Sequence, residues 1–229
     1  MAIPLKSIGF FWKGKNMDKL ESVQLKEAFD RDGVVVIRNF IAQKQIDEIC
    51  ERAEILTRRL PKRSDIFSNI TKGLDKIDDY FNDLLFKGPQ VPVLEMLLGE
   101  KPEPTTASIF TKDKYSQEVH PHSDAMKGGV VWLAIDATNI GNGCLQFLKG
   151  SDQKKEEFAH LSASEPTDFS SHPDRFECTM SSGDIAFFRP TTVHWSGPNH
   201  EGSSRRGLNY FYVGDAFKGL ENRYRKENG

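Results

Sequence analysis

The sequence predicts an α+β fold, mainly β, in which N-terminal helices brace a β-sandwich or barrel. Helical patterns occupy the first part of the 229-residue chain, and from Pro104 onward short β-rich runs are separated by Gly, Pro, Asn and Asp. Helices that come first and strands that come afterwards are typical of this fold class. We therefore expect a single domain over residues 1–229, with helical support in roughly 1–103 and the β core in roughly 104–214.

The first helix should begin near Asp18 and stop at Gly33, and the run VVVIRNF after it should be a short strand. A second helix should end before Pro61, because the residue that precedes a proline disfavours helical geometry. Its apolar face would consist of Ile46, Ile49, Cys50, Ala53, Leu56 and Leu60. Two weaker helical patterns follow, LDKIDDYFNDLLF and VPVLEMLLG, and Gly99 closes the second.

The β-like runs of the core are TTASIFT, GGVVWLAIDAT, CLQFLKG, DIAFFRP, VHWSG and RRGLNYFYV. Within them, Trp132 and Phe147 fit the hydrophobic core better than a substrate contact. Residues 152–179 form the longest stretch without a pattern, and unpatterned segments of this length are usually functional loops or disordered.

Composition and charge argue against several classes of protein. The 31 basic and 33 acidic residues nearly cancel, so neither a nucleic acid nor a membrane is an expected partner. No apolar run reaches membrane-spanning length, and the N-terminus does not resemble a secretion signal. Three cysteines without a CxxC pair favour neither a disulfide framework nor a thiolate zinc site. We expect a cytoplasmic protein, and its oligomeric state stays open.

Candidate metal ligands lie in two distant parts of the chain. His122 and Asp124 are two residues apart, so in an extended strand both side chains point to the same side. His194 follows a strand-like run and precedes a Gly-Pro turn. Two imidazoles and one carboxylate form the facial triad that holds non-haem Fe(II) and leaves coordination positions open. His120 has the wrong spacing for this set.

A dicarboxylate that chelates iron through one end needs a cation for its other end, and a guanidinium matches a carboxylate best. Arg205 lies eleven residues after His194, but a slip of one residue would present Arg206 instead. If Arg205 points inward, Gly207 shares its face and leaves room for a ligand. Thr111 and Lys112 are further candidates to hold this ligand, although an ordinary strand threonine and a solvated lysine fit the sequence equally well.

Several motifs resemble the phytanoyl-CoA dioxygenase family of Fe(II)/2-oxoglutarate-dependent oxygenases. They are HSD at residues 122–124, VVWLAIDATNIGNGCLQFLKGSDQ, GDIAFFRPTTVHWSGPNHEGSSRRGLNYFYV and, near the N-terminus, FDRDGVVVIRNF. The resemblance is strong over residues 119–213 and loose over 41–118. It implies a double-stranded β-helix, the cupin-like jelly roll, as the core that the N-terminal helices brace.

Carried over to this chain, the resemblance implies that His122, Asp124 and His194 bind Fe(II) and that Arg205 binds the distal carboxylate of 2-oxoglutarate. The metal ligands would be the only catalytic residues. Lys149-Gly150-Ser151-Asp152 departs from the Pro-Gly-Ser-His of the family. Trp195 replaces a glycine, so we expect its ring to narrow the cavity and to contact substrate.

The implied activity is that of a dioxygenase, a hydroxylase, that uses O2 to oxidise an unactivated C–H bond and releases succinate and CO2. A small metabolite, such as an amino acid or a biosynthetic intermediate, is the expected substrate. Residues 61–90 and 152–178 resemble the family least, so we expect them to select it. Two alternatives are a non-catalytic metal-binding jelly roll and an oxygenase that acts on a macromolecule.

Overall fold

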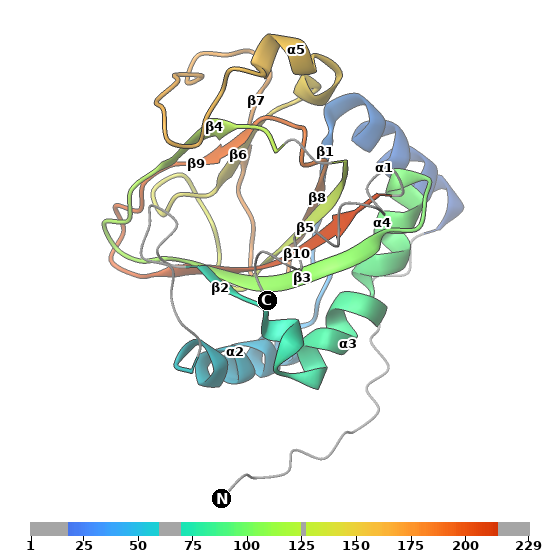
Figure 1. Ribbon diagram of the computed structural model, residues 1–229, viewed down its shortest axis with the longest axis vertical. Helices are drawn as coiled ribbons and strands as arrows, with labels where there is room; N and C mark the ends of the chain where they lie inside the picture. The colour runs from blue at the N-terminus through green and yellow to red at the C-terminus, as the bar shows by residue number, and fades with distance from the viewer. Residues whose placement is uncertain (1–17, 60–69, 125–126, 215–229) are drawn as a thin grey trace, which may run out of the picture.

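A computed structural model describes residues 18–59, 70–124 and 127–214. In these ranges two antiparallel sheets pack face to face, and helices cover the outer side of the larger sheet (Figure 1). The larger sheet has six strands in the order β1-β8-β5-β10-β3-β2, and the smaller has four in the order β4-β9-β6-β7. The predicted α+β architecture, mainly β with bracing helices, is confirmed, and the two facing sheets have the arrangement of a jelly roll.

The helices are α1 (Lys19–Asp32), α2 (Gln43–Thr57), η1 (Leu74–Lys76), α3 (Asp79–Lys87), α4 (Gln90–Leu98), η2 (Ser151–Gln153) and α5 (Lys155–Phe158). Helix α1 has the predicted ends. The Asp18 side chain accepts a hydrogen bond from the Glu21 backbone, and the Glu21 side chain accepts one from Asp18 in return, so the two form a capping box. Gly33 ends the helix in the left-handed conformation, with φ 72°.

The strands are β1 (Val34–Ile37), β2 (Ile70–Lys72), β3 (Glu103–Lys112), β4 (Val119–His122), β5 (Gly128–Ala134), β6 (Leu145–Leu148), β7 (Arg175–Cys178), β8 (Ile185–Phe188), β9 (His194–Ser196) and β10 (Arg205–Val213). Three of them, β2, β4 and β7, were not expected from the sequence. All three lie at sheet edges. A short edge strand pairs on one side only, and the neighbouring strand recruits it without the apolar alternation that marks a central strand.

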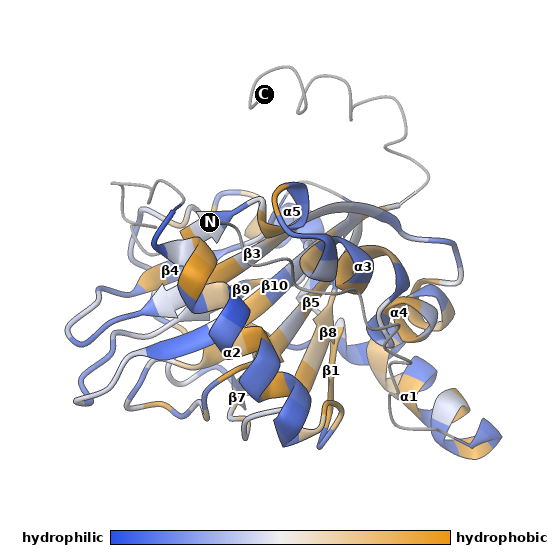
Figure 2. Cartoon of the chain, turned by 90° about the horizontal axis from the view of Figure 1, so that it is seen from below, coloured by the Kyte–Doolittle hydropathy of each residue, from blue (hydrophilic) through white to orange (hydrophobic). Residues whose placement is uncertain are grey.

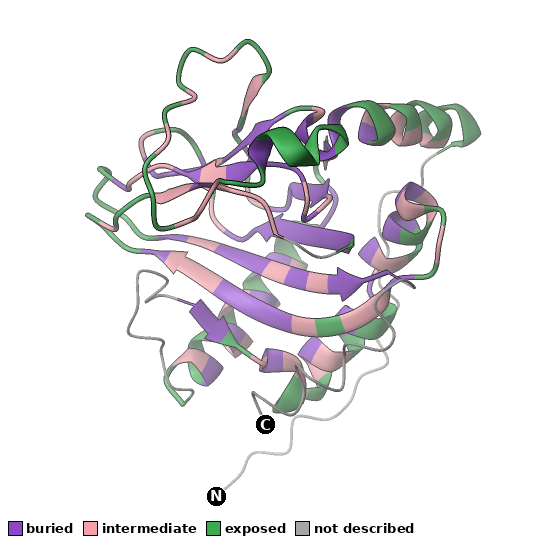
Figure 3. Cartoon of the chain, turned by 45° about the horizontal axis from the view of Figure 1, so that its top comes forward, coloured by how far each residue is buried: buried purple, intermediate pink, exposed green. Residues whose placement is uncertain are grey.

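The helix-facing side of the larger sheet carries the main hydrophobic core. Helix α2 buries Ile46, Ile49, Ala53 and Leu56 there, while Cys50 is half-buried and Leu60 lies outside the described residues. Full burial of one such aliphatic side chain contributes about 1.5–3 kcal/mol. Figure 2 shows hydrophobic residues along β1, β5 and β8, and Figure 3 shows that the outer surface of α1 is exposed.

The N-terminal part of the chain does more than brace the core, because it contributes two strands to the larger sheet. β1 pairs with β8, and β2 pairs with β3. The expected change of character near residue 104 is therefore not a structural boundary. Among the described residues, no helix combines the length and apolarity that crossing a bilayer would require.

A second core lies between the two sheets. It includes Trp132 from β5, Phe188 from β8 and Phe147 from β6, all buried. The core positions expected for Trp132 and Phe147 are thus confirmed. The candidate metal site borders this core, because the ring of His194 lies 5.2 Å from that of Phe188 and 6.2 Å from that of Phe147.

Candidate active site

Strands β4 and β9 bring two imidazoles together. They pair in the smaller sheet with His122 directly opposite His194, and the two ring centroids are 4.4 Å apart. These histidines are 72 positions apart in the chain. Side chains directly opposite each other on an antiparallel pair lie on the same face of the sheet, so both rings share one face.

A backbone carbonyl orients each ring. The Nδ1 atom of His122 lies 2.8 Å from the carbonyl oxygen of His120, and that of His194 lies 2.8 Å from the carbonyl oxygen of Thr192. A carbonyl only accepts, so each Nδ1 carries the hydrogen and each Nε2 keeps a free lone pair. This is the tautomer in which Nε2 binds a metal. His120 thus contributes its backbone carbonyl to the orientation of the His122 ring.

Burial keeps His194 uncharged. Its side chain is 9% exposed. Burial, and to a smaller extent the neighbouring His122, lowers the pKa of His194 to about 4. Asp124 acts in the opposite direction. The ring is neutral at pH 7, as metal binding requires.

Asp124 lies near this pair without completing a cluster. Its backbone N–H donates to the carbonyl oxygen of Pro190 at 2.8 Å, which ties the end of the H-x-D motif to the turn that precedes β9. Within residues 18–59, 70–124 and 127–214, no three His, Cys, Asp or Glu side chains converge closely enough to hold a metal ion. The imidazoles are in place, and the carboxylate is close enough to influence the pKa of His194.

The two candidate arginines differ sharply in their surroundings. Arg206 forms an ion pair with Asp136 through Nε and Nη2, both at 2.8 Å. Arg205 is 3% exposed, donates to the carbonyl oxygen of Gly143 and leaves its buried Nε without a partner. Burial lowers the pKa of Arg205 to about 10, so it stays protonated at pH 7. Of these two arginines, Arg205 is therefore the one without an acidic ion-pair partner among the described residues.

The expected space above Gly207 does not exist. The guanidinium of Arg205 lies 5.1 Å from the ring centre of Trp132, and a Cβ atom at Gly207 would come within 1.9 Å of that indole. The prediction that Gly207 leaves room for a ligand is therefore wrong. The missing side chain admits Trp132, which packs on the guanidinium through a cation–π contact.

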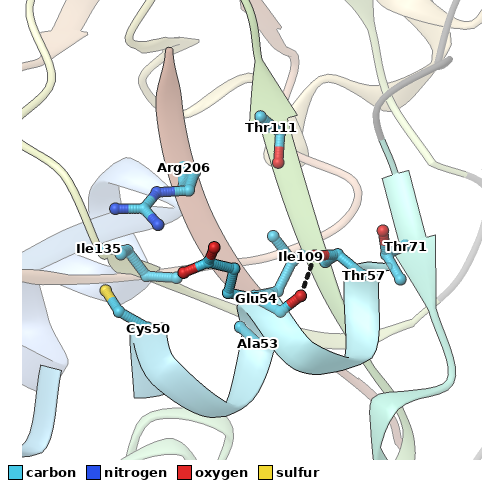
Figure 4. A pocket seen from close by; sticks show the side chains of 9 residues that line it. All are labelled: Cys50, Ala53, Glu54, Thr57, Thr71, Ile109, Thr111, Ile135 and Arg206. Atoms are coloured by element: carbon cyan, nitrogen blue, oxygen red, sulfur yellow. Dashed lines mark hydrogen bonds between the residues drawn. The ribbon is translucent and has the colours of Figure 1, made fainter. Parts of the chain in front are cut away.

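Thr111 and Lys112 cannot both lie beside Arg205, because neighbours in a strand point to opposite faces. Lys112 is the register partner of Arg205, and Thr111 is that of Arg206. Thr111 and Arg206 line a pocket of about 200 Å³ on the α2 side of the larger sheet (Figure 4). The structure thus contradicts the prediction that Thr111 contacts 2-oxoglutarate beside Arg205.

The Trp195 side chain also lies on the opposite face of its strand, β9, from the one expected. It follows His194 directly in β9, so its side chain points away from the imidazole pair. It packs in a cluster with Phe169, Phe158 and Leu161, and its ring centroid is 6.0 Å from that of Phe169. The prediction that Trp195 narrows the iron cavity is therefore wrong. These three partners belong to the 152–178 segment, which here packs on the outer face of the smaller sheet.

Two further polar groups were not singled out from the sequence. Ser196 is buried and shares the face of His194, from which it is two residues removed along β9. Strand alternation alone was a sufficient signal for it. Asn199 is fully buried and donates to the carbonyl oxygens of Lys112 and Ser203, both at 2.9 Å. No local pattern distinguishes that asparagine from one in a solvated turn.

Solved structures with a similar fold support the jelly roll. The epimerase SnoN in complex with Fe³⁺, α-ketoglutarate and nogalamycin RO is 19% identical, with a TM-score of 0.71 over 86% of this chain and 85% of SnoN. EctD from S. alaskensis with 2-oxoglutarate and 5-hydroxyectoine is 16% identical, with a TM-score of 0.68 over 84% of this chain and 76% of EctD. At these identities the likeness establishes the fold.

Sequence comparison identifies the family. A protein from Caenorhabditis elegans described as a probable phytanoyl-CoA dioxygenase is 22% identical over 85% of this chain and 76% of its own length. The family model described as Phytanoyl-CoA dioxygenase (PhyH) matches residues 29–207, well over half of the sequence. The chain therefore belongs to the phytanoyl-CoA dioxygenase (PhyH) family, a family of dioxygenases that depend on Fe(II) and 2-oxoglutarate.

Proposed function

We propose that His122, His194 and Asp124 hold Fe(II) in this oxygenase and that Arg205 anchors the distal carboxylate of 2-oxoglutarate. One observation carries the assignment: a buried guanidinium, without an acidic ion-pair partner among the described residues, borders the core between the two sheets. An uncompensated buried charge is costly, so a site of this kind is suited to an anionic ligand. A protein that only bound a metal would have no use for this cation.

The donor set fits Fe(II). Two imidazoles whose Nδ1 atoms face backbone carbonyls share one face of the sheet, and a carboxylate lies nearby. We propose that the Asp124 side chain moves toward the imidazoles when the metal binds. Bound iron, with 2-oxoglutarate as co-substrate, supplies the O2 activation that oxidises a substrate C–H bond and yields succinate and CO2.

The protein contributes binding, orientation and exclusion of water. The carbonyl oxygens of His120 and Thr192 hold the two ligand rings in one orientation. Phe147 and Phe188 flank His194 with apolar surface. An apolar wall strengthens the interaction between Arg205 and a carboxylate, because the local dielectric constant is lower than that of water.

For the substrate we propose a small metabolite, such as an amino acid or a biosynthetic intermediate. The nogalamycin RO bound to SnoN and the 5-hydroxyectoine bound to EctD are small molecules held by proteins of this fold. A macromolecular substrate is the less favoured alternative, because the near-balance of 31 basic and 33 acidic residues offers no electrostatic attraction for nucleic acid.

The assignment is tested by spectroscopy and by product analysis. Purified protein is mixed anaerobically with Fe(II) and 2-oxoglutarate, and the charge-transfer absorption of the chelate is recorded before O2 is admitted. We expect the band, and then succinate, with the yield rising when the correct metabolite is present. His194→Ala should abolish the band. A band that never leads to succinate with any metabolite would favour the non-catalytic binder, and wild-type protein without a band would refute the iron site.

A further inference from the structure

Two connections between the sheets lie side by side at one end of the molecule (Figure 1). Residues 113–118 lead from β3 in the larger sheet to β4 in the smaller one, and residues 197–204 lead back from β9 to β10. We call these two segments the crossover joint. The Tyr115 N–H donates to the Asn199 carbonyl at 2.8 Å, and the Asn199 N–H donates to the Ser116 carbonyl at 3.1 Å. The two segments are therefore hydrogen-bonded to each other.

The Lys112 side chain adds a second link between the same segments. Its Nζ donates to the carbonyl oxygen of Gln117 at 2.8 Å and to that of Gly197 at 2.7 Å. Gln117 lies two residues before β4, and Gly197 follows β9 directly. Lys112 is only 8% exposed, so water cannot readily replace these bonds.

The position of Lys112 also relates the joint to Arg205. Lys112 ends β3, and its backbone is in register with Arg205, which begins β10. One residue is thus linked through its backbone to the arginine and through its side chain to the segments that flank the histidine-bearing strands. In this arrangement the ammonium is committed to two protein carbonyls, which leaves only its third N–H for another partner.

We propose, on the basis of the function proposed above, that Lys112 is a positioning residue and not a 2-oxoglutarate ligand. Its Nζ group holds the crossover joint closed through these two hydrogen bonds. It thereby sets the separation between the two histidines on the smaller sheet and Arg205 on the larger. Iron and the distal carboxylate must be bridged by one molecule of fixed length. A displacement of about 1 Å between such groups can lower a rate about a hundredfold.

The test uses Lys112→Met, which keeps an unbranched side chain only one atom shorter and removes its donors. Exposed Lys114, in the same crossover, is the site of the matched control variant Lys114→Met. The first readout is hydrogen exchange of the metal-free protein. We expect faster exchange in residues 117–122 and 194–200 of Lys112→Met, with unchanged exchange in the middle of β5 and β8. Lys114→Met should match the wild type throughout.

The second readout is anaerobic Fe(II) affinity in the absence of 2-oxoglutarate. We expect Lys112→Met to bind Fe(II) about tenfold more weakly than the wild type, as is typical when a group that orients metal ligands is lost. Lys112→Gln keeps two N–H donors without the charge, and we expect it to recover part of the lost affinity. Normal exchange and normal Fe(II) affinity, with a loss confined to 2-oxoglutarate binding, would overturn the proposal.

The outcomes separate this inference from the proposed function. If wild-type protein fails to bind Fe(II), the metal assignment fails, while hydrogen exchange still tests the joint without any metal. If the wild type binds Fe(II) and Lys112→Met equals it in both readouts, only the positioning role fails. Should Lys112→Met yield too little folded protein, Lys112→Gln and Lys114→Met are compared by the same two measurements. If Lys112→Gln, which has a shorter side chain, then behaves like the wild type, the positioning role of Lys112 is refuted.

Discussion

Lys112 and Arg205 are register partners on β3 and β10, and both carry their cationic groups into the interior. Burial, and secondarily the neighbouring Arg205, lower the pKa of Lys112 to about 7. No Asp or Glu in the described part of the chain forms an ion pair with either residue. Two adjacent buried cations are unfavourable for the empty protein. The arrangement is therefore suited to an anionic ligand.

Arg205→Met should weaken 2-oxoglutarate binding by about 30-fold or more and leave Fe(II) affinity within about twofold of the wild type. Loss of one partner from a buried, hydrogen-bonded charge pair costs at least about 2 kcal/mol, which corresponds to that factor. The measurement is a titration of the Fe(II)-loaded protein with 2-oxoglutarate, followed through the charge-transfer band.

Arg206→Met is the matched control for this variant. It breaks the ion pair with Asp136. The side chains of Arg206 and Asp136 are 37% and 29% exposed, so we expect a stability loss of about 1 kcal/mol or less. Its affinity for 2-oxoglutarate should equal that of the wild type. If the two variants exchange their phenotypes, Arg206 is the anchor and the face assignment is reversed.

The affinity for 2-oxoglutarate should fall as pH rises above about 7. A carboxylate on Arg205 offsets the charge that depresses the pKa of Lys112, so ligand binding raises this pKa and takes up a proton. Glu118 already acts in the same direction. The dissociation constant should increase by up to about tenfold per pH unit above pH 7. Calorimetry in two buffers of different ionisation enthalpy measures the proton uptake, which should vanish in Lys112→Met.

The Lys112 side chain should also make the stability of the ligand-free protein depend on pH. The pKa of Lys112 is about 7 in the folded protein, against an ordinary value of 10.5. Between these values the unfolded chain binds more protons than the folded one, so the contribution of Lys112 to the free energy of unfolding rises with pH. Urea unfolding at pH 7 and pH 9 should show this gain in the wild type relative to Lys112→Met. A gain of equal size in both would contradict the assigned cause.

Gly207→Ala should destabilise the protein by about 1–3 kcal/mol and also weaken 2-oxoglutarate binding. The new methyl group would lie 1.9 Å from an atom of Trp132, so the indole must move away from Arg205. Thermal unfolding and a 2-oxoglutarate titration measure the two effects. Gly202→Ala is the control, because a Cβ atom there meets nothing within 4 Å. A tolerated Gly207→Ala would mean that the indole is not confined.

Trp195→Leu should lower stability by about 1–2 kcal/mol through lost packing on Phe169 and leave the iron chelate unchanged. The side chain lies on the face of β9 opposite to that of His194, so neither Fe(II) nor 2-oxoglutarate affinity should move by more than about twofold. Chemical denaturation and the charge-transfer titration are the measurements. A large change in either affinity would mean that Trp195 contributes to the iron and 2-oxoglutarate site.

The sequence by itself predicted the order of the elements, the ends of α1 and the central strands. Capping residues, left-handed glycines and strong apolar patterns act over a few neighbouring positions, so they are readable without the fold. The edge strands β2, β4 and β7 were missed because an edge strand depends on its neighbour more than on its own composition.

The sequence also determined which residue types could hold iron and a carboxylate, since the H-x-D motif, the distal histidine and the arginine after it can be identified without the fold. Only the tertiary structure decided which face each side chain occupies. In the folded protein, the Thr111 and Trp195 side chains point away from the candidate site. Arg206 is paired with Asp136, and the indole of Trp132 occupies the space at Gly207. The physical reason is that a shift of one residue reverses every side chain in a strand, and pairing across two sheets is what sets that register.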